Sequence, residues 1–473
     1  MALVITITFI AVGALVAITL IKGFEAALPF FAFLVTVLPG EARFDFWGLF
    51  VLTTTRAAIA TLAVLYIVLG NKHPNSDRSN RLPLKYLLIL YIGWRMVATA
   101  NSIVFTTSLK TVLSDTLEFC LVYYIIAKSL SKVETVRKIL AAFVAALAVC
   151  CVFGALDYYA HWKVIDLFPT VVYRFTPGVG GRMPDSGRIK ATFGHAILFG
   201  NALALGIPWA LYLLGMAKTA AQKVYLWLAI IMMAWNMYKT QSRGPWLALV
   251  LSLLLLFIFS QGSLRKYLVV IALLTVSALI IRPGVWDALK STYVDTGNPD
   301  SVRGGSYQYR YDLMRVAREA LAEDPRRAVW GFGPESFYYV GLEGEDSTTG
   351  RIAKFESCDS SFVEVAVDTG YVGLFLLAAL LIKVAFLSLK GFTTVPRPAN
   401  FLCLLFLINI AAFAFMMFSV MNFGWGQQAL MLWILMALSV VYPRLAEAEN
   451  VAKRGAVIPL LETRPQWADV PPL

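Results

Sequence analysis

The stretch TQSRGPWLA at residues 240–248 places an arginine between two apolar runs, each long enough to span a lipid bilayer. Arg243 is followed by Gly244 and Pro245, and proline is well suited to the first position of a helix. With Gly244 as the N-cap, the free amides of that helix point outward beside the guanidinium, which suits an anion and most naturally a phosphate. The alternative is an interfacial arginine that anchors the span to lipid headgroups, and the residues alone leave both open.

A second arginine lies on the apolar face of a predicted helix in a long polar segment. In SYQYRYDLMRVAREALAEDP, residues 306–325, Tyr307 and Met314 recur with Arg310 at helical spacing, and Pro325 is expected to end the helix. A guanidinium on such a face usually has a partner, because unpaired burial of charge is expensive. The alternative is that Arg310 snorkels past the edge of the helix into water.

Asp359 is the candidate proton acceptor for a hydroxyl group. It precedes an apolar run in which Ser361 and Glu364 form an S-x-x-E capping box, and that pairing leaves Asp359 outside the cap. His195, at the start of the apolar run 191–216, is the rival base, although a lone histidine is more often structural. The residues therefore offer two bases, of which we favour Asp359.

Composition decides the class of protein that holds these residues. Hydrophobic residues make up 59% and charged residues 15% of the 473 residues, and the mean hydropathy is +0.70, which indicates a polytopic membrane protein and excludes an ordinary soluble one. The first twenty residues lack a basic n-region and a cleavage site, so we expect a retained span. The five cysteines show no zinc spacing, there is no D-x-D motif, and the EGED run at 343–346 is typical of a solvated acidic loop; we expect no metal and no cofactor.

Hydropathy predicts an all-α fold with about 12 to 13 membrane-spanning helices. The spans are expected at 3–22, 26–40, 47–70, 84–106, 109–128, 138–158, 191–216, 222–238, 245–260, 266–282, 360–382, 400–421 and 427–442. Basic residues gather in every second connector, as at Lys128, Lys132 and Arg137 and again at Lys390 and Arg397, and the positive-inside rule names that side cytoplasmic.

The opposite side then receives 161–190, 239–244 and the long segment 283–359. Lys239 and Arg243 therefore lie where topology does not call for positive charge. We expect the site to face the extracytoplasmic side of the membrane. We divide the chain into N-terminal spans, a core that contains the long outer loop, and a Pro-rich disordered cytoplasmic tail, at 1–185, 186–442 and 443–473.

Two charges inside the spans are expected to pair. With the turn after the 84–106 helix placed near residue 107, Arg95 and Glu118 lie at matching depths on neighbouring antiparallel helices. Such a pair is either structural or part of the wall of a polar cavity. Arg56, similarly deep in its own span, is a second candidate for that cavity.

The order of these motifs resembles the core of the O-antigen ligase and polymerase superfamily. The similarity covers roughly residues 185 to 385. It consists of TQSRGPWLA, the loop helix with Arg310, DPRRAVWGFG and CDSSFVEVAVDTGYVG, while RIKATFGHAILFGNALAL resembles the segment before that core in exopolysaccharide polymerases. The resemblance implies a glycosyltransferase fold of the C type and glycan transfer from a polyprenyl pyrophosphate at the periplasmic membrane face. In that reading Arg243 and Arg310 hold the pyrophosphate.

The resemblance also separates two activities. Ligases carry His and Asn where this sequence has Asp359 and Ser360, and the aspartate resembles polymerase-like members. We therefore predict a metal-independent polymerase that transfers polyprenyl-pyrophosphate-linked repeat units to a growing polysaccharide, with Asp359, Arg243 and Arg310 as catalytic residues. The candidate substrate-binding residues are Lys239, His195, Arg188, Arg95 and Glu118.

Two other functions stay open at this point. The first is a ligase that moves glycan to lipid A core or to protein, and the second is a transporter for a small anion such as bicarbonate. The expected partners are the lipid-linked glycan, an acceptor glycan, membrane lipids, a flippase and a chain-length regulator, and we expect no nucleic acid.

Overall fold

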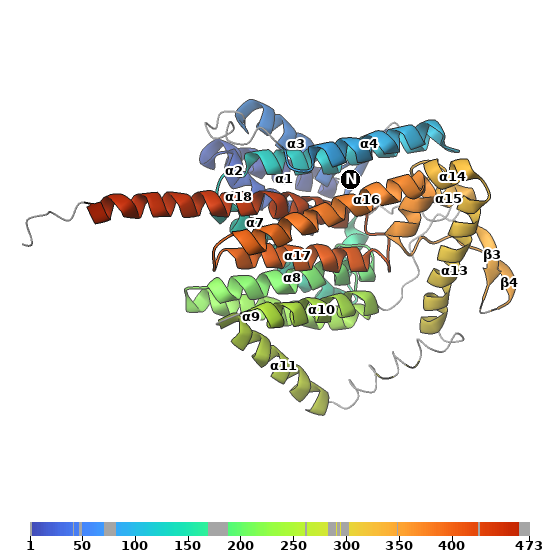
Figure 1. Cartoon of the computed structure of the whole chain (residues 1–473). Coiled ribbons are helices and arrows are strands. Elements are labelled where there is room, and N and C mark those ends of the chain that lie inside the picture. The colour runs from blue at the N-terminus through green and yellow to red at the C-terminus, as the bar shows by residue number, and fades with distance from the viewer. Residues whose placement is uncertain are drawn as a thin grey trace, which may run out of the picture.

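The structure is a computed structural model that describes residues 2–40, 42–46, 50–70, 82–168, 188–260, 263–281, 290, 294, 302–347, 349–423 and 426–462. Each predicted span contains a helix, and most of these helices lie side by side along one axis, while α11 runs obliquely to them (Figure 1). They are α1 Ala2–Lys22, α2 Phe24–Val37, α3 Thr54–Leu69, α4 Lys85–Ala100, α5 Phe105–Asp115, α6 Leu121–Ser129, α7 Val133–Tyr159, α8 Ala196–Met216, α9 Ala220–Thr240, α10 Arg243–Phe259, α11 Ser263–Ile281, α16 Ser361–Thr394, α17 Asn400–Met416 and α18 Gly426–Glu462. A π-helical turn, Thr116–Cys120, joins α5 to α6, and a 3-10 turn, Val164–Leu167, follows α7.

The long outer loop folds into elements of its own at one end of the bundle. These are α13 Val302–Ala322, α14 Pro325–Trp330, α15 Phe337–Val340 and the hairpin of β3 Glu343–Asp346 with β4 Arg351–Lys354. We call this end the loop end and the opposite end, where α18 leaves the bundle, the tail end (Figure 1). The acidic run at 343–346, expected as a solvated loop, is thus a strand.

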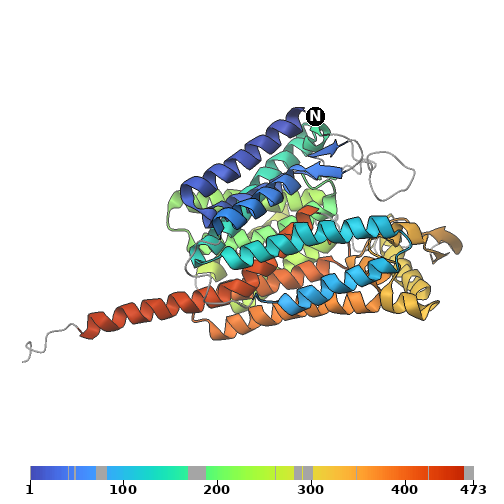
Figure 2. The same cartoon turned by 90° about the horizontal axis from the view of Figure 1, so that it is seen from above.

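Five helices in the described part of the chain are long and apolar enough to cross a membrane: α1, α7, α8, α16 and the first 27 residues of α18. The apolar stretch of α8 is 89% buried and that of α1 is 22% buried, so α8 lies in the middle of the bundle and α1 at its edge. Figure 2 agrees, with the first helices in blue on one side and α16 in orange on the other. The chain is an all-α polytopic membrane protein, as its composition predicted.

Two segments differ from the expected elements. Residues 47–53 were expected in a span, but β1 Arg43–Phe46 pairs with β2 Phe50–Thr53 before α3 begins. The tail was expected to be disordered from residue 443, but α18 continues to Glu462, because RLAEAENVAKRGA is rich in strong helix formers. Residues 463–473, with the PQWADVPPL end, lie outside the described residues.

The outer loop is fastened to the bundle where α16 breaks. Gly370 has φ 69° and interrupts α16, and a Cβ there would lie 2.1 Å from the carbonyl oxygen of Val329. The segment from Val329 to Phe337, here the docking segment, packs into this break. Its amides at Phe332 and Gly333 donate to the carbonyls of Val367 and Asp368, each at 2.8 Å. The loop therefore takes its position from main-chain contacts with a membrane helix.

Two side chains complete this contact. The carboxylate of Asp368 accepts the amides of Glu335 at 2.7 Å and Phe337 at 3.0 Å. The rings of Trp94 and Trp330 stack at 4.9 Å, which adds α4 to the contact. The docking segment thus fixes the end of the loop helix that follows Arg310.

Candidate functional site

Arg310 and Asp359 form an ion pair at the loop end of the bundle. A guanidinium nitrogen of Arg310 lies 3.0 Å from Oδ2 of Asp359, and the two side chains are 21% and 29% exposed. Oδ1 of Asp359 accepts a hydrogen bond from Ser357 Oγ at 2.9 Å. The expectation that Arg310 has a partner is confirmed, and the partner is the carboxylate singled out as the candidate base.

Helix α13 presents Arg310 from a face that packs on the loop core. Leu313 and Ala317 share that face and are buried, whereas Met314, expected there, is 46% exposed. The buried face therefore lies about one residue away from the one that the spacing predicted. The reason is that Asp312, which is 1% exposed, turns inward to accept the Ser347 amide at 3.0 Å.

Tyr309 positions the residues that precede Asp359. Its hydroxyl donates to the carbonyl of Ser357 at 2.9 Å and accepts the amide of the same residue at 3.0 Å. Burial raises the pKa of Tyr309 to about 12, so the phenol keeps the proton that it donates. Sequence reasoning missed Tyr309; its place next to Arg310 was the available signal.

Asp359 lies outside the cap of α16, as predicted, but the capping residue is a different one. Ser360 is the N-cap and its hydroxyl accepts the Val363 amide at 3.5 Å. Ser361, expected to cap, donates instead to the carbonyl of Val420 at 3.1 Å and accepts the Asn422 amide at 2.8 Å. The expected capping box is therefore wrong, because the hydroxyl of Ser361 bonds to the turn after α17.

Arg188 is a second cation of the site, and its side chain is hydrogen-bonded to the start of α10. Its Nε donates to the carbonyl of Thr240 at 2.7 Å, and its Nη2 donates to Ser242 Oγ at 2.6 Å. Ser242 is the N-cap of α10 and Arg243 is its first residue, so the prediction of Gly244 as N-cap was wrong by two positions. Pro245 then occupies the third position, which is tolerated because the amides of the first turn have no partner within the helix.

The start of α10 and the start of α16 meet at one turn. A Cβ on Gly244 would lie 2.7 Å from Ser419 Oγ, and the Ser361 amide donates to the carbonyl of Met417 at 2.9 Å. Both contacts fall in the turn that follows α17. Arg243 and Asp359 therefore approach the same turn from two helices.

His195 caps α8 within this group of cations. Its Nδ1 accepts the Ile197 amide at 3.2 Å, which leaves the ring proton on Nε2. Burial, with a contribution from Arg188, Lys190 and Arg310, lowers the pKa of His195 to about 4. A neutral ring with its lone pair already engaged is a poor base, so the structure gives His195 the capping role that we expected of a lone histidine.

These residues define an outer cationic cluster. Its members are Arg188, Lys190 and Arg310, which all lower the pKa of His195, and Arg243, which follows the Ser242 that Arg188 contacts. The carboxylate of Asp157, which accepts the Lys190 amide at 3.1 Å, lies beside it together with Asp359. Cations gathered at the start of a helix are suited to bind a phosphate.

A comparison with known protein families finds one that matches part of the chain. Residues 228–378 match the family described as O-antigen ligase. This segment is similar to the O-antigen ligases. No curated protein matches the chain. The resemblance to the O-antigen ligase and polymerase superfamily is confirmed, and it supports a membrane glycan ligase or polymerase type of function.

The matched segment, residues 228–378, holds part of the predicted site. Lys239, Arg243, Arg310 and Asp359 lie within it, whereas Arg188, His195, Arg95 and Glu118 precede it. Arg188 and His195 reach the matched segment through the contacts described above. The cluster is therefore assembled from the matched segment and from the residues just before α8.

Lys239, within the matched segment, has aromatic surroundings. Its Nζ donates to the Tyr158 hydroxyl at 2.7 Å and lies 3.9 Å from the centre of that ring. Trp235 and Tyr238 lie within 6.0 Å of the same nitrogen. Among the described contacts none joins Lys239 to Arg310 or Asp359.

Arg95 and Glu118 do not pair with each other, so that prediction was wrong. Arg95 pairs with Asp115 at 2.7 Å, and Glu118 pairs with Arg56 at 2.7 Å. The turn after α4 lies at 101–104 rather than near 107, which moves the matching depth toward the loop end and brings Asp115 opposite Arg95. Ser114 joins the second pair, since it accepts from Arg56 at 2.8 Å and donates to Glu118 at 2.6 Å.

Metal binding by carboxylates or histidines gains no support from the described residues, where no group of three His, Cys, Asp or Glu side chains could hold an ion. Glu364 shows why a nearby carboxylate does not add to the site. It faces Asp368 and Arg95 inside the bundle rather than the outer cationic cluster.

Proposed function

We propose that the protein is a glycan polymerase that transfers polyprenyl-pyrophosphate-linked repeat units to a growing polysaccharide. The observation that supports this best is the Arg310–Asp359 ion pair beside the other cations of the outer cluster. It brings together a cation for a departing pyrophosphate and a carboxylate for an incoming hydroxyl. Glycan transfer needs both groups at one place.

The proposed step begins when the pyrophosphate binds the outer cationic cluster. Arg243 and Arg310 each offer the planar fork that matches phosphate oxygens, and Arg310 turns from Asp359 to the phosphate. The freed carboxylate then accepts the proton of the acceptor hydroxyl. That oxygen bonds to the anomeric carbon as the bond from this carbon to the pyrophosphate oxygen breaks, and the polyprenyl pyrophosphate leaves with the electron pair.

His195 holds the site together in this proposal. Its neutral ring caps α8, and the main chain just before it carries Arg188 and Lys190. Loss of the ring would loosen the segment that fastens Arg188 to the start of α10. His195 is thus a positioning residue, and Asp359 is the proton acceptor.

The site lies at the loop end, which the positive-inside rule assigns to the periplasm of an inner-membrane protein. A polyprenyl carrier in that leaflet would present its pyrophosphate at the ends of the spans, the depth at which α10 and α16 begin. The fold of the C-type glycosyltransferases is the one that the family implies for such a site.

A ligase is the second candidate, and the description of the matched family favours it. The residues at 359 and 360 favour the polymerase, because ligases of this superfamily carry His and Asn there and this chain has Asp and Ser. The two reactions differ in the acceptor and not in the donor. Product length therefore separates them.

The test uses the purified protein in detergent with a lipid-linked repeat unit and a gel that resolves products by length. A ladder made from this substrate alone supports the polymerase. A single transfer that needs lipid A core supports the ligase, and neither product, from protein that is folded, contradicts both.

Arg310→Gln tests the ion pair in the same assay. We expect it to abolish the ladder, because it removes the cation that both pyrophosphate and Asp359 use. Arg318→Gln is the matched control, since Arg318 lies on an exposed part of the same helix. Equal ladders from both variants would remove Arg310 from the proposal.

A further inference from the structure

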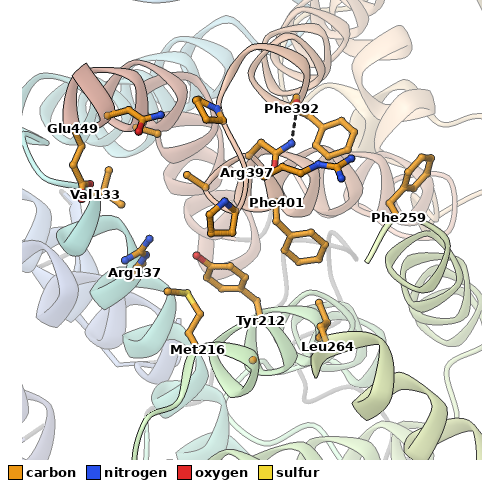
Figure 3. A pocket seen from close by; sticks show the side chains of 17 residues that line it. Val133, Arg137, Tyr212, Met216, Phe259, Leu264, Phe392, Arg397, Phe401 and Glu449 are labelled. Carbon is orange, nitrogen blue, oxygen red and sulfur yellow. Dashed lines mark hydrogen bonds between the residues drawn. The ribbon is translucent and has the colours of Figure 1, made fainter. Parts of the chain in front are cut away.

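A cavity of about 550 Å³ opens at the tail end of the bundle, far from the outer cationic cluster (Figure 3). It lies where the ends of several spans meet: the start of α7, the ends of α8 and α10, the start of α11, the connector from α16 to α17, and α18. No residue of the proposed glycan site lines it. Its function is therefore a separate question.

Two arginines from different elements line this cavity. Arg137 comes from α7 and Arg397 from the connector between α16 and α17, and Figure 3 shows them on different sides of Tyr212 and Phe401. Nε of Arg137 is buried and has no hydrogen-bond partner among the described residues. Two guanidinium groups on the wall of one cavity suit a ligand with acceptor oxygens.

The charge of the lining favours an anion. Glu449 of α18 also lines the cavity, so the two guanidinium groups exceed the carboxylate by one charge. The Tyr212 hydroxyl lies beside the Arg137 guanidinium and adds a further polar contact. Arginine forks and a hydroxyl are the groups that bind phosphate oxygens in proteins.

Much of the remaining lining is apolar, although Asn400 and Asn450 also belong to it, and part of it is open to the surroundings. Phe392, Phe401 and Leu264 form part of the wall, and Met216 and Phe259 are 42% and 48% exposed. A small inorganic anion would gain nothing from such a wall. A ligand that carries both a phosphate and a hydrocarbon chain would use both parts of the cavity.

The depth of the cavity matches the headgroup layer of a bilayer. Met216 ends α8 and Phe259 ends α10, so the cavity begins where these apolar spans stop. Basic pockets between spans on the side of the positive connectors are suited to anionic lipid headgroups. We propose that this cavity binds the phosphate of an anionic phospholipid, with an acyl chain along its apolar wall.

The test measures lipid binding to the full-length protein in detergent by native mass spectrometry. The probes are phosphatidylglycerol, phosphatidylcholine with the same acyl chains, and inorganic phosphate. We expect at least one phosphatidylglycerol to bind about tenfold or more tightly than phosphatidylcholine, because only the former carries net negative charge. Equal affinity for the two lipids, or displacement of phosphatidylglycerol by millimolar inorganic phosphate, would overturn the proposal.

Variants assign the binding to this cavity. Arg397→Gln and Arg137→Gln are each expected to weaken phosphatidylglycerol binding about tenfold or more, whereas Lys218→Gln, at an exposed position at the same end of the bundle, should bind as the wild type does. Arg397 is exposed, so its variant tests the proposal even if Arg137→Gln does not fold. Binding by Arg397→Gln equal to that of the wild type would place the lipid elsewhere. Because the measurement is binding and not glycan transfer, failure here leaves the proposed polymerase untouched, and the reverse also holds.

Discussion

Charged residues occur in two regions of this protein, and the balance of charge differs between them. Among the spans, Arg56 pairs with Glu118 and Arg95 with Asp115, so each cation has its own carboxylate. Among the described residues of the loop end, the four cations of the outer cationic cluster lie near the carboxylates of Asp157 and Asp359. Balanced pairs hold helices together, whereas an excess of one charge prepares a site for a ligand of the opposite charge.

Exposure does not separate the regions as charge does. The side chains of Arg310 and Asp359 are 21% and 29% exposed, those of Arg95 and Asp115 are 13% and 25% exposed, and those of Arg56 and Glu118 are 30% and 16% exposed. The loop-end pair is therefore more accessible than the Arg95–Asp115 pair but not more than Arg56. The four predictions below test whether the first region acts through stability and the second through activity.

The largest expected effect is on the proton acceptor. Asp359→Asn keeps the shape of the side chain but removes the base, so the transfer rate should fall roughly 10²- to 10⁴-fold. The free energy of unfolding should change by less than about 1 kcal/mol, because the lost ion pair is partly exposed. Initial rates and thermal unfolding of the same preparation check both values, with Glu323→Gln as an exposed carboxylate control.

A rate for Asp359→Asn within a factor of a few of the wild type would contradict the assignment. A large loss of stability in Asp359→Asn would also contradict the assignment, because Asp359 would then have a structural role like the carboxylates of the ion pairs in the spans.

The next effect concerns phosphate recognition. Arg243→Lys keeps the charge but loses the planar fork, and we expect kcat/KM to fall roughly 10- to 100-fold, the value of one charge-assisted hydrogen bond. Arg326→Lys, at an exposed position of α14, is the control and should behave as the wild type does. Steady-state kinetics with varied lipid-linked donor give the answer. Full activity in Arg243→Lys would leave Arg243 as a lipid-headgroup anchor.

A substitution in an ion pair of the spans should lower the stability of the protein rather than its activity. Asp115→Asn leaves Arg95 without its carboxylate, and we expect the free energy of unfolding to drop by roughly 1 to 3 kcal/mol, less than for a fully buried pair. Arg95→Met combined with Asp115→Leu should recover part of this loss. Thermal unfolding in detergent measures it. If the double variant is as unstable as the single one, the pair is not what stabilises this part of the bundle.

The smallest effect is the pH dependence of stability that His195 contributes. Its pKa is about 4 in the folded protein and has an ordinary value of 6.5, so between these values the unfolded chain binds the extra proton. Stability is then lost as the pH falls, by about 1 kcal/mol between pH 6.5 and pH 5.5. His195→Asn keeps an N-cap but cannot titrate, and its unfolding should vary less over this interval. Identical slopes for the two proteins would show that His195 titrates normally.

Much of the fold could be predicted from the sequence, because the bilayer permits few solutions. A hydrophobic run must form a helix to satisfy its own backbone, and every predicted span contains one. The residues at which the helices begin and end were less predictable. Residues 50–53 were expected in a span but form a strand of a hairpin, and the tail helix continues past residue 443 in a stretch rich in strong helix formers.

The site could be predicted in its residues but not in its contacts. Arg310 needed a partner, and Asp359 stood outside a cap, yet nothing in the spacing indicated that the two would meet across 49 positions. The pair of Arg95 was misassigned because a shift of a few residues in one turn exchanges Glu118 for Asp115. Ion-pair partners whose positions depend on loop geometry can be assigned only from the structure.

The docking segment has a consequence for how related chains can vary. It is held at α16 largely by the main chain, through the amides of residues 332 and 333 and the glycine at 370. Most side chains along it can therefore be substituted without moving the loop helix. The number of residues between Arg310 and Phe332 cannot change in the same way, because one residue inserted in the helix would turn the guanidinium about 100° around its axis and away from Asp359. Among homologous chains, the length of this interval should therefore vary less than its amino-acid composition.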